Sequence, residues 1–280
     1  MHFLIYTNKL KDPELEFTKS VQAYLQEKGQ ASTLCVKEFD EATSLSHFTL
    51  PEADVMLVLG GDGTVLEAAR DAGDRTLPMV GVNLGTLGYL SEIEKKDVFF
   101  AIDRILSGDY KKESRMMLEG SIRKKDDTST VQRALNDMVI SRTESIHIVD
   151  IRISVNGQFL HEYHADGVIV TTATGSTGYN LSAGGPIVEP TAKLMILTPI
   201  CPHTLNQRSI VLSPEDEIEI SISPRGDIPA PKVEVAADGT SFGRVEPGDK
   251  IIIKKAEKTV VLIQLGQRSF LEILHQKMKD

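Results

Sequence analysis

The chain has 280 residues and a formal net charge of −9, and this length allows one large domain or two modest ones. Hydrophobic residues make up 41% of the chain and charged residues 25%, which is the usual balance of a soluble globular protein. The acidic excess argues against broad electrostatic binding to nucleic acid or to an anionic membrane. A small anionic ligand remains compatible with it, because a local nest of backbone amides can bind phosphate in an acidic protein.

The cysteines and the apolar runs of the sequence indicate the cellular compartment of the protein. Cys35 and Cys201 are the two cysteines, and they form no disulfide framework and suit a reducing cytosol. The chain opens with residues 1–6 and runs straight into polar residues, so we expect no signal peptide. No stretch approaches the ~18 apolar residues that a membrane span requires. We therefore predict a cytoplasmic protein with no membrane or nucleic-acid partner.

The first part of the chain has the pattern of alternating strands and helices. In chain order we expect a strand at 3–6, a helix from Asp12-Pro13 to Gly29, strands at 32–39, 55–59 and 79–83, and a helix at 98–106. Asp12 and Pro13 suit the N-cap and the first turn of the first helix, and Gly29 suits its end. The alternation predicts a doubly wound α/β domain over residues 1–115, which would bind ligands at the carboxyl ends of its strands.

The pattern changes beyond residue 115. Apolar and polar residues alternate at 151–155 and 217–220, and Asn156-Gly157 and Asp238-Gly239 have the composition of tight turns. A helix is suggested only near 192–197. We predict a mostly β domain over residues 116–255. The C-terminal segment 256–280, with a strand at 259–265 and a short helix, is expected to return to the first domain.

The most informative stretch is Gly60-Gly61-Asp62-Gly63-Thr64, which directly follows the apolar strand and precedes a helix. Its glycines leave backbone N–H groups uncovered, and the helix N-terminus adds a partial positive charge. Gly60, Gly61, Gly63 and Thr64 are therefore candidate phosphate-binding residues. A carboxylate such as Asp62 would repel a polyphosphate unless it serves a cation or a proton transfer, and phosphoryl transfer uses both. A tight strand-to-helix turn is the alternative.

Two other segments have the composition of a nucleotide site. Residues 166–182 join a buried strand to a run of hydroxyl residues and glycines, with Tyr179 able to pack on a base or ribose. Asn136-Asp137 offers an amide and a carboxylate at a strand edge. A loop between strands and an Asx turn explain the same residues. His161 and His164 have the wrong spacing for a zinc helix and would point to opposite faces of a strand.

Together these segments resemble the NAD kinase family over most of the chain. The glycine stretch at 60–64 is similar to the family's G-G-D-G-T motif, Asn136-Asp137 to its N-E/D motif, and residues 172–179 to T-P-T-G-S-T-A-Y. Residues 184–188 and 198–205 with Arg208 also resemble family segments. The chain departs from the family pattern at four positions. These are Ala173 in place of Pro, Gly178 in place of Ala, Asp137 in place of the more frequent Glu, and His164 where many bacterial members have Arg. The two departures in the 172–179 loop suggest greater mobility there.

The resemblance implies an NAD kinase that transfers the γ-phosphoryl group of ATP to the 2′-hydroxyl of the adenosine ribose of NAD, giving NADP. It implies Mg²⁺ or another divalent cation with ATP as the donor, Asp62 as the catalytic base, and a homo-oligomer, either a tetramer or a dimer. No side chain is assigned as a metal ligand. The implied NAD-binding residues are Asp62, Gly63, Asn136, Asp137, His147, His164, Asp166, Thr177, Gly178, Tyr179, Asn180, Leu181 and Ser182.

Two other functions stay open at this stage. A lipid kinase would share the glycine motif but would need a basic or amphipathic surface that binds membranes, and the acidic composition of the chain does not indicate one. A non-catalytic dinucleotide sensor would gain nothing from a carboxylate beside phosphate. The sequence does not decide between ATP and polyphosphate as donor, and it is silent on NADH acceptance, feedback by NADP and the exact oligomeric state.

Overall fold

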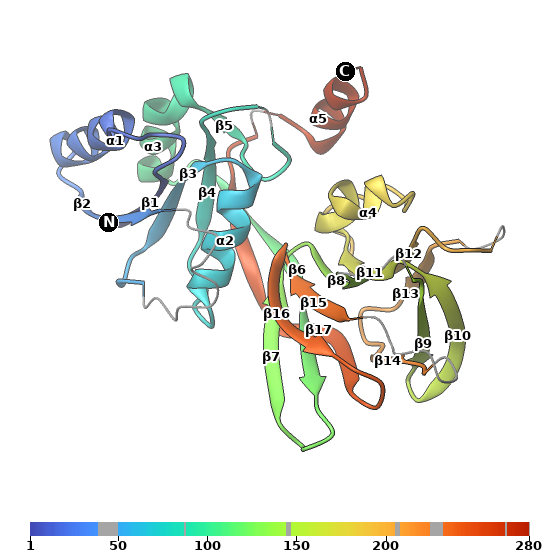
Figure 1. Cartoon of the computed structure of the whole chain (residues 1–280). Coiled ribbons are helices and arrows are strands. Elements are labelled where there is room, and N and C mark those ends of the chain that lie inside the picture. Colours follow the sequence, from blue (N-terminus) through green and yellow to red (C-terminus); the bar gives the residue numbers. More distant parts are fainter. Residues whose placement is uncertain are drawn as a thin grey trace. The chain divides into compact units, whose positions relative to one another are not determined.

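The structure of the chain is a computed structural model that describes residues 1–38, 50–86, 88–143, 147–204, 208–224, 232–266 and 268–279. The chain divides into two compact units (Figure 1). The first unit contains Met1–Arg115 and Thr259–Asp280, and the second contains Met116–Lys258. Two strands, β6 (Lys111–Arg123) and β17 (Lys250–Gln264), include the points where the chain passes from one unit to the other.

The first unit is built on a parallel sheet. Its strands lie in the order β2 (Ala31–Lys37), β1 (His2–Asn8), β3 (Val55–Gly60) and β4 (Met79–Asn83), and β4 also pairs with the short β5 (Ile93–Glu94) and with the end of β17. Strand β1 is hydrogen-bonded to β2 on one side and to β3 on the other. The chain order therefore reverses between β1 and β3, and this topological switch point is where doubly wound folds bind ligands.

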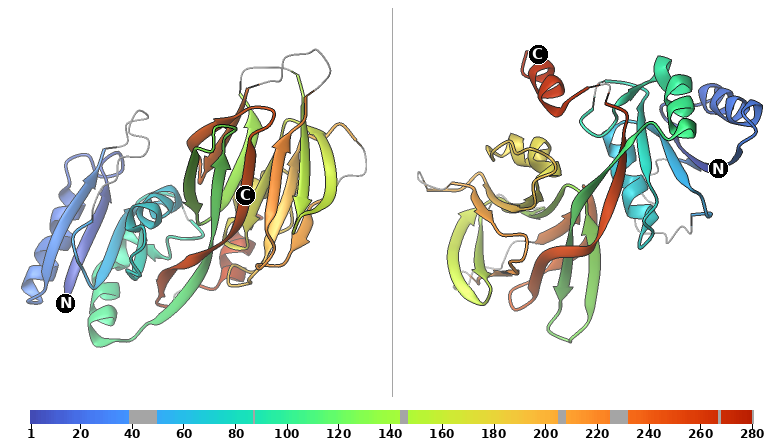
Figure 2. Two further views of the ribbon diagram at one scale, coloured as in Figure 1. Left: turned by 90° about the horizontal axis from the view of Figure 1, so that it is seen from below. Right: turned by 180° about the vertical axis from the view of Figure 1, so that it is seen from behind.

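Helices cover both faces of this sheet. Helices α1 (Glu16–Glu27) and α3 (Val98–Ser107) lie side by side on one face, and α2 (Asp62–Ala72) lies on the other (Figures 1 and 2). The rings of Tyr24 on α1 and Phe99 on α3 are 4.7 Å apart. A short 3₁₀ turn, η1 (Lys95–Asp97), precedes α3, and α5 (Phe270–Lys277) ends the chain. The buried faces of the strands and helices form one apolar core.

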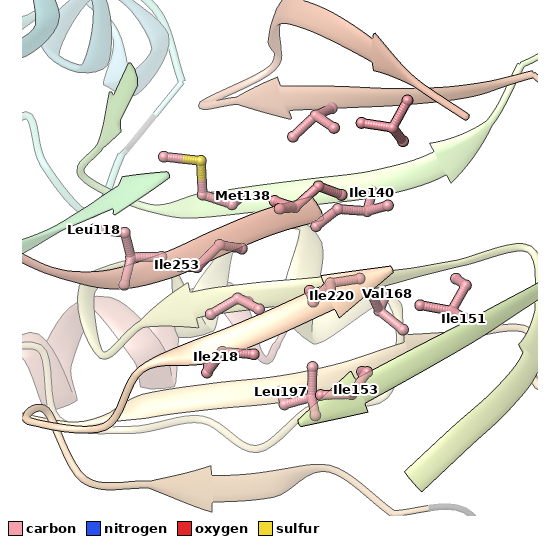
Figure 3. Packing of buried hydrophobic residues seen from close by; sticks show 14 of the residues in the cluster. Leu118, Met138, Ile140, Ile151, Ile153, Val168, Leu197, Ile218, Ile220 and Ile253 are labelled. Carbon is pink, nitrogen blue, oxygen red and sulfur yellow. The ribbon is translucent and has the colours of Figure 1, made fainter. Parts of the chain in front are cut away.

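The second unit consists of two antiparallel sheets. One sheet has the order β13 (Ile210–Leu212), β12 (Met195–Ile200), β11 (Gly167–Thr172), β8 (Asp137–Arg142), β15 (Val233–Ala237) and β16 (Thr240–Val245). The other contains β10 (Gln158–Ala165), β9 (Val149–Val155), β14 (Ile218–Ile222), β17, β6 and β7 (Ser129–Ala134). Figure 3 shows apolar side chains of both sheets packed against one another, among them Ile140 and Val168 from the first and Ile153 and Ile220 from the second. This packing explains the alternation of apolar and polar residues in the strands.

The predicted fold class, an α/β domain followed by a mostly β domain, is confirmed. One predicted helix start is wrong. Helix α1 begins at Glu16 instead of Asp12-Pro13, because residues before it turn through Leu15 with a φ of 56°. Asp12 still binds a free N–H group in the first turn of α1, since its carboxylate accepts a hydrogen bond from the Thr18 backbone N–H at 2.8 Å.

The helix suggested near 192–197 is also wrong, because this apolar segment enters strand β12. All six residues of β12 are buried between its neighbours β11 and β13. A short, mostly apolar run has no periodicity that separates a buried strand from a helix. The helical residues of the region are instead η2 (Thr174–Thr177) and α4 (Tyr179–Ser182).

Some predicted positions lie outside the described residues. They are Phe39 at the end of the second predicted strand, Leu87 in the glycine-rich loop after β4, and Leu205 in the family-like segment. Among the residues that the structure does describe, no helix combines the length and the apolar character needed to cross a membrane.

Candidate functional site

The glycine stretch after β3 forms the first turn of α2 at the switch point of the sheet. A Cβ at Gly60 would lie 2.2 Å from the hydroxyl oxygen of Thr64, so this position accepts only glycine while Thr64 keeps its place. A Cβ at Gly61 or Gly63 would meet no protein atom within 4 Å. The first N–H groups of a helix have no intrahelical acceptor. The side-chain positions of these two glycines are therefore open, so a ligand can approach the start of α2 closely.

The carboxylate of Asp62 is held by a loop that follows β4. Its Oδ2 accepts a hydrogen bond from the Tyr89 N–H at 2.7 Å, and its Oδ1 accepts from the N–H groups of Leu90 at 3.0 Å and Ser91 at 3.2 Å. A Cβ at Gly88 would lie 1.9 Å from Oδ1. Backbone donors thus fix the orientation of this carboxylate, and the sequence motif alone does not reveal them.

Thr64 shapes the loop from inside. Its side chain is buried, and its hydroxyl accepts hydrogen bonds from the side-chain amide of Asn8 at 3.1 Å and from the Gly61 N–H at 3.4 Å. Asn8 is the last residue of β1, so this contact joins the two sides of the switch point. Sequence reasoning missed Asn8, whose only local signal is its place at the end of a buried strand.

The second unit brings Asn136, Asp137 and Gly178 together. A Cβ built on Gly178 would lie 3.5 Å from the Asn136 Nδ2 and 3.9 Å from the Asp137 Oδ2. The side-chain oxygen of Asn136 is buried and makes no hydrogen bond within the described part of the chain. Buried polar atoms are normally paired. An unpaired oxygen beside an acid therefore suits a ligand that donates hydrogen bonds.

Asp137 titrates in an unusual range. It is the first residue of β8 and is 6% exposed. Burial, together with the negative charge of Asp238, raises the pKa of its carboxyl to about 7. The group changes charge near neutral pH, and perturbed carboxyls of this kind concentrate at functional sites.

The loop 174–182 presents some of its predicted residues and buries others. Tyr179 is 46% exposed and Leu181 40% exposed, and Ser182 is also exposed. Asn180 is fully buried, donates to the carbonyls of Ser176 and Pro186, and accepts from the Thr198 hydroxyl at 2.7 Å. The family-like segments 184–188 and 198–205 thus supply partners that hold this loop, and Asn180 positions it from inside.

The predicted residues His164 and Asp166 lie at the other end of β11. The His164 ring is 2.5 Å from the Asp150 carboxylate, and Asp166 accepts a hydrogen bond from the Arg142 guanidinium at 2.8 Å. Asp137 pairs with Thr171 near the end of β11, whereas Asp166 precedes its first residue. Five residues of strand span roughly 17 Å. His147 is exposed and lies before β9. The resemblance assigns all these residues to NAD, with Asn136 and Asp137 at its adenosine half and Asp166 at its nicotinamide side, and the chain by itself keeps the two groups apart.

The described residues contain no cluster of three His, Cys, Asp or Glu side chains placed to hold a metal ion. A divalent cation such as Mg²⁺ is commonly bound through substrate phosphates with few protein ligands.

Comparison with known proteins places these features in a family. The profile of the ATP-NAD kinase N-terminal domain matches residues 4–110, and that of the ATP-NAD kinase C-terminal domain matches residues 135–265. An NAD kinase of Lachnospira eligens is 41% identical, with 99% of each chain covered. The chain belongs to the NAD kinase family. An NAD kinase of Agathobacter rectalis is 43% identical and matches over 99% of this chain and 98% of its own length.

Solved structures of NAD kinases have the same fold. An NAD kinase from Archaeoglobus fulgidus in complex with ATP matches with a TM-score of 0.77 and 25% identity, covering 98% of this chain and 99% of that one. Yeast NADH kinase complexed with NADH matches with a TM-score of 0.84 and 24% identity, covering 100% of this chain and 88% of that one. The second likeness bears on the fold alone.

Proposed function

We propose that this member of the NAD kinase family transfers the γ-phosphoryl group of ATP to the 2′-hydroxyl of the adenosine ribose of NAD, giving NADP. The observation that carries the proposal is the Asp62 carboxylate. It is fixed by three backbone donors at the start of α2 and flanked by two glycines with open space in front of them. Nucleotide binding alone would not require a carboxylate at this place, whereas proton removal from an attacking hydroxyl does.

Asp62 accepts the proton of the 2′-hydroxyl as that oxygen attacks the γ-phosphorus of ATP, and ADP leaves. The Gly63 N–H and the partial positive charge at the start of α2 stabilise the negative charge on the phosphate oxygens, and Gly61 has no side chain to keep them away. Gly60 leaves room for the Thr64 side chain, and the Thr64 hydroxyl keeps the loop in shape by accepting a hydrogen bond from the Gly61 N–H. Mg²⁺ is part of the MgATP substrate, and when bound it neutralises phosphate charge.

On the NAD side, Asn136 and Asp137 bind the adenosine half of NAD, and Tyr179 packs against the dinucleotide. The unpaired oxygen of Asn136 and the carboxyl of Asp137 supply acceptors for amine and ribose hydroxyl groups. The exposed side chains of the 177–182 loop line the pocket. Asp166, His164 and His147 serve the nicotinamide end. Asn136 and Asp137 lie near one end of β11 and Asp166 near the other. The two groups therefore bind different parts of one extended NAD molecule, or they bind NAD molecules held by different subunits of a homo-oligomer, a tetramer or a dimer.

The acidic net charge of −9 supports the proposal of no nucleic-acid or membrane partner. The proposal of a cytoplasmic enzyme rests on the two cysteines, which suit a reducing compartment. Family membership and the relatives named NAD kinase favour this enzyme over a lipid kinase and over a non-catalytic dinucleotide sensor.

The deciding experiment compares NAD with 2′-deoxy-NAD, each incubated with the purified protein, ATP and Mg²⁺. We expect NADP from NAD, read out with an NADP-specific dehydrogenase, and no phosphorylated product from the deoxy analogue by mass spectrometry. The analogue should still bind, because one missing hydroxyl costs about 0.5–1.5 kcal/mol. Phosphate on the deoxy analogue would place the transfer on another hydroxyl. Binding of both without turnover would indicate a sensor, and binding of neither a different substrate.

Replacing Tyr179 with alanine is expected to weaken NAD binding by about 1–3 kcal/mol, because the substitution removes aromatic contact area without touching the reacting oxygen. Isothermal calorimetry with NAD measures the effect. Phe159→Ala is the matched control, since Phe159 is a comparably exposed aromatic residue, at 54%, on β10. An unchanged NAD affinity in folded Tyr179→Ala protein would remove Tyr179 from the pocket.

A further inference from the structure

Asp238 lies at the tight turn between β15 and β16, which sequence reasoning treated as a turn only. Its φ is 47°, and Gly239 follows with a φ of 77°. An Asp-Gly pair with two positive φ angles is the usual composition of a two-residue hairpin turn. The hairpin accounts for the backbone of Asp238 but not for the direction of its side chain.

The Asp238 carboxylate leaves the hairpin and binds three consecutive backbone amides. Its Oδ2 accepts from the Leu135 N–H at 2.7 Å, and its Oδ1 accepts from the N–H groups of Asn136 at 2.8 Å and Asp137 at 3.1 Å. In the reverse direction, the Asp238 N–H donates to the Asp137 carbonyl at 3.0 Å. Hydrogen bonds from backbone amides to a charged acceptor are among the stronger ones in proteins.

The same short segment is held from its other side by the end of β11. The Thr172 hydroxyl donates to the Leu135 carbonyl at 2.7 Å, and the Thr171 hydroxyl donates to the Asn136 carbonyl at 2.8 Å. A Cβ at Gly175 would lie 2.4 Å from that Asn136 carbonyl oxygen. Asp238 therefore supplies the amide-side half of a clamp on residues 135–137, and β11 supplies the carbonyl-side half.

We propose that Asp238 is a positioning residue for the dinucleotide site, because its carboxylate fixes the backbone from which Asn136 and Asp137 project. This inference rests on the proposed function for the role of Asn136 and Asp137. Asp238 also acts through its charge, which together with burial raises the pKa of Asp137 to about 7. Below that pH Asp137 is mostly neutral, and above it the carboxylate can accept hydrogen bonds from ribose hydroxyls.

The functional test uses Asp238→Asn, which keeps one acceptor oxygen and tolerates the left-handed backbone but removes the charge. We expect the KM for NAD to rise about 10-fold while the KM for ATP stays within twofold. In the unsubstituted protein the KM for NAD should fall as pH rises through about 7. In Asp238→Asn the midpoint should move to lower pH, because the charge that raises the Asp137 pKa is gone. An unchanged midpoint and an unchanged KM for NAD would overturn the proposal.

Asn156→Ala is the matched control. Asn156 has a φ of 51° in the turn between β9 and β10, and its side chain accepts a hydrogen bond from the Glu217 N–H at 2.9 Å. It resembles Asp238 in conformation and in clamping a distant backbone, but it contacts a different segment. We expect this substitution to lower the melting temperature without changing the KM for NAD or its pH dependence. A rise in the KM for NAD equal to that of Asp238→Asn would show that loosening any hairpin has the same effect, and would overturn the proposal.

A second measurement does not depend on activity. Amide hydrogen exchange in the ligand-free protein should accelerate at Leu135 in Asp238→Asn, because the new side-chain amide cannot accept from that N–H. In Asp238→Ala the exchange should accelerate at all three amides of residues 135–137. If exchange rises as expected in the variants but the unsubstituted protein makes no NADP, the proposed function is refuted and the clamp by Asp238 is supported. Unchanged exchange at these amides would refute the clamp itself.

Discussion

Replacing Asp62 with asparagine is expected to lower kcat by ~10²–10⁴-fold while the KM for NAD changes little. Asparagine has nearly the same shape but cannot take up the proton of the 2′-hydroxyl. The amide oxygen of the asparagine can take the place of Oδ1 and accept the hydrogen bonds from the Leu90 and Ser91 N–H groups. The new NH₂ group faces the Tyr89 N–H as a second donor, so a small loss of thermal stability should accompany the kinetic effect.

The measurement is steady-state kinetics of both substrates, with the melting temperature of each variant recorded. Asp97→Asn makes the same chemical change at the residue before α3 in the same unit. We expect its kcat to stay within twofold of the unsubstituted value. Near-normal turnover by Asp62→Asn would remove Asp62 as the base and leave it as a loop anchor.

Replacing Gly88 with alanine is expected to reduce kcat by about 100-fold, although Gly88 has no functional group. The new Cβ would lie 1.9 Å from the Asp62 Oδ1 and 2.6 Å from its Cγ. The carboxylate or the 88–91 loop must therefore move, and a displacement of this size at a catalytic group costs on the order of 10²-fold. Overpacking also destabilises by about 1–3 kcal/mol.

Gly85→Ala is the control for this variant. Gly85 belongs to the same loop, and the nearest atom to its added Cβ is the Lys11 ammonium at 3.7 Å, an ordinary contact. A double variant, Gly88→Ala with Asp62→Ala, tests the cause. If the clash with Asp62 is responsible, the stability cost of Gly88→Ala should shrink in the Asp62→Ala background by about 0.5–3 kcal/mol. Equal cost in both backgrounds would assign the effect to the loop backbone instead.

Much of the fold could be predicted from the sequence because neighbouring residues carry its pattern. The strands β3 and β4 and the helix α3 fall where apolar runs and helical periodicity place them. The two failures have different causes. The apolar run near 192–197 becomes β12 because β11 and β13 flank it, and sequence periodicity does not contain that pairing. The start of α1 moves because Leu15 adopts a left-handed turn before it.

The sequence by itself also determined the motifs of the candidate site, since the glycines, Asp62 and the Asn136-Asp137 pair lie in contiguous segments. Only the tertiary structure decided how these groups are held. The backbone N–H groups of residues 89–91 orient Asp62. The Asp238 carboxylate accepts hydrogen bonds from residues that lie 101 to 103 positions earlier in the chain. Tertiary structure also placed Asp166 and Asp137 at opposite ends of β11. The physical reason is that a backbone amide donates equally well from almost any residue type. The residue types at 89–91 and 135–137 therefore do not show that their amides bind a carboxylate. Such an interaction can be recognised only in the folded structure.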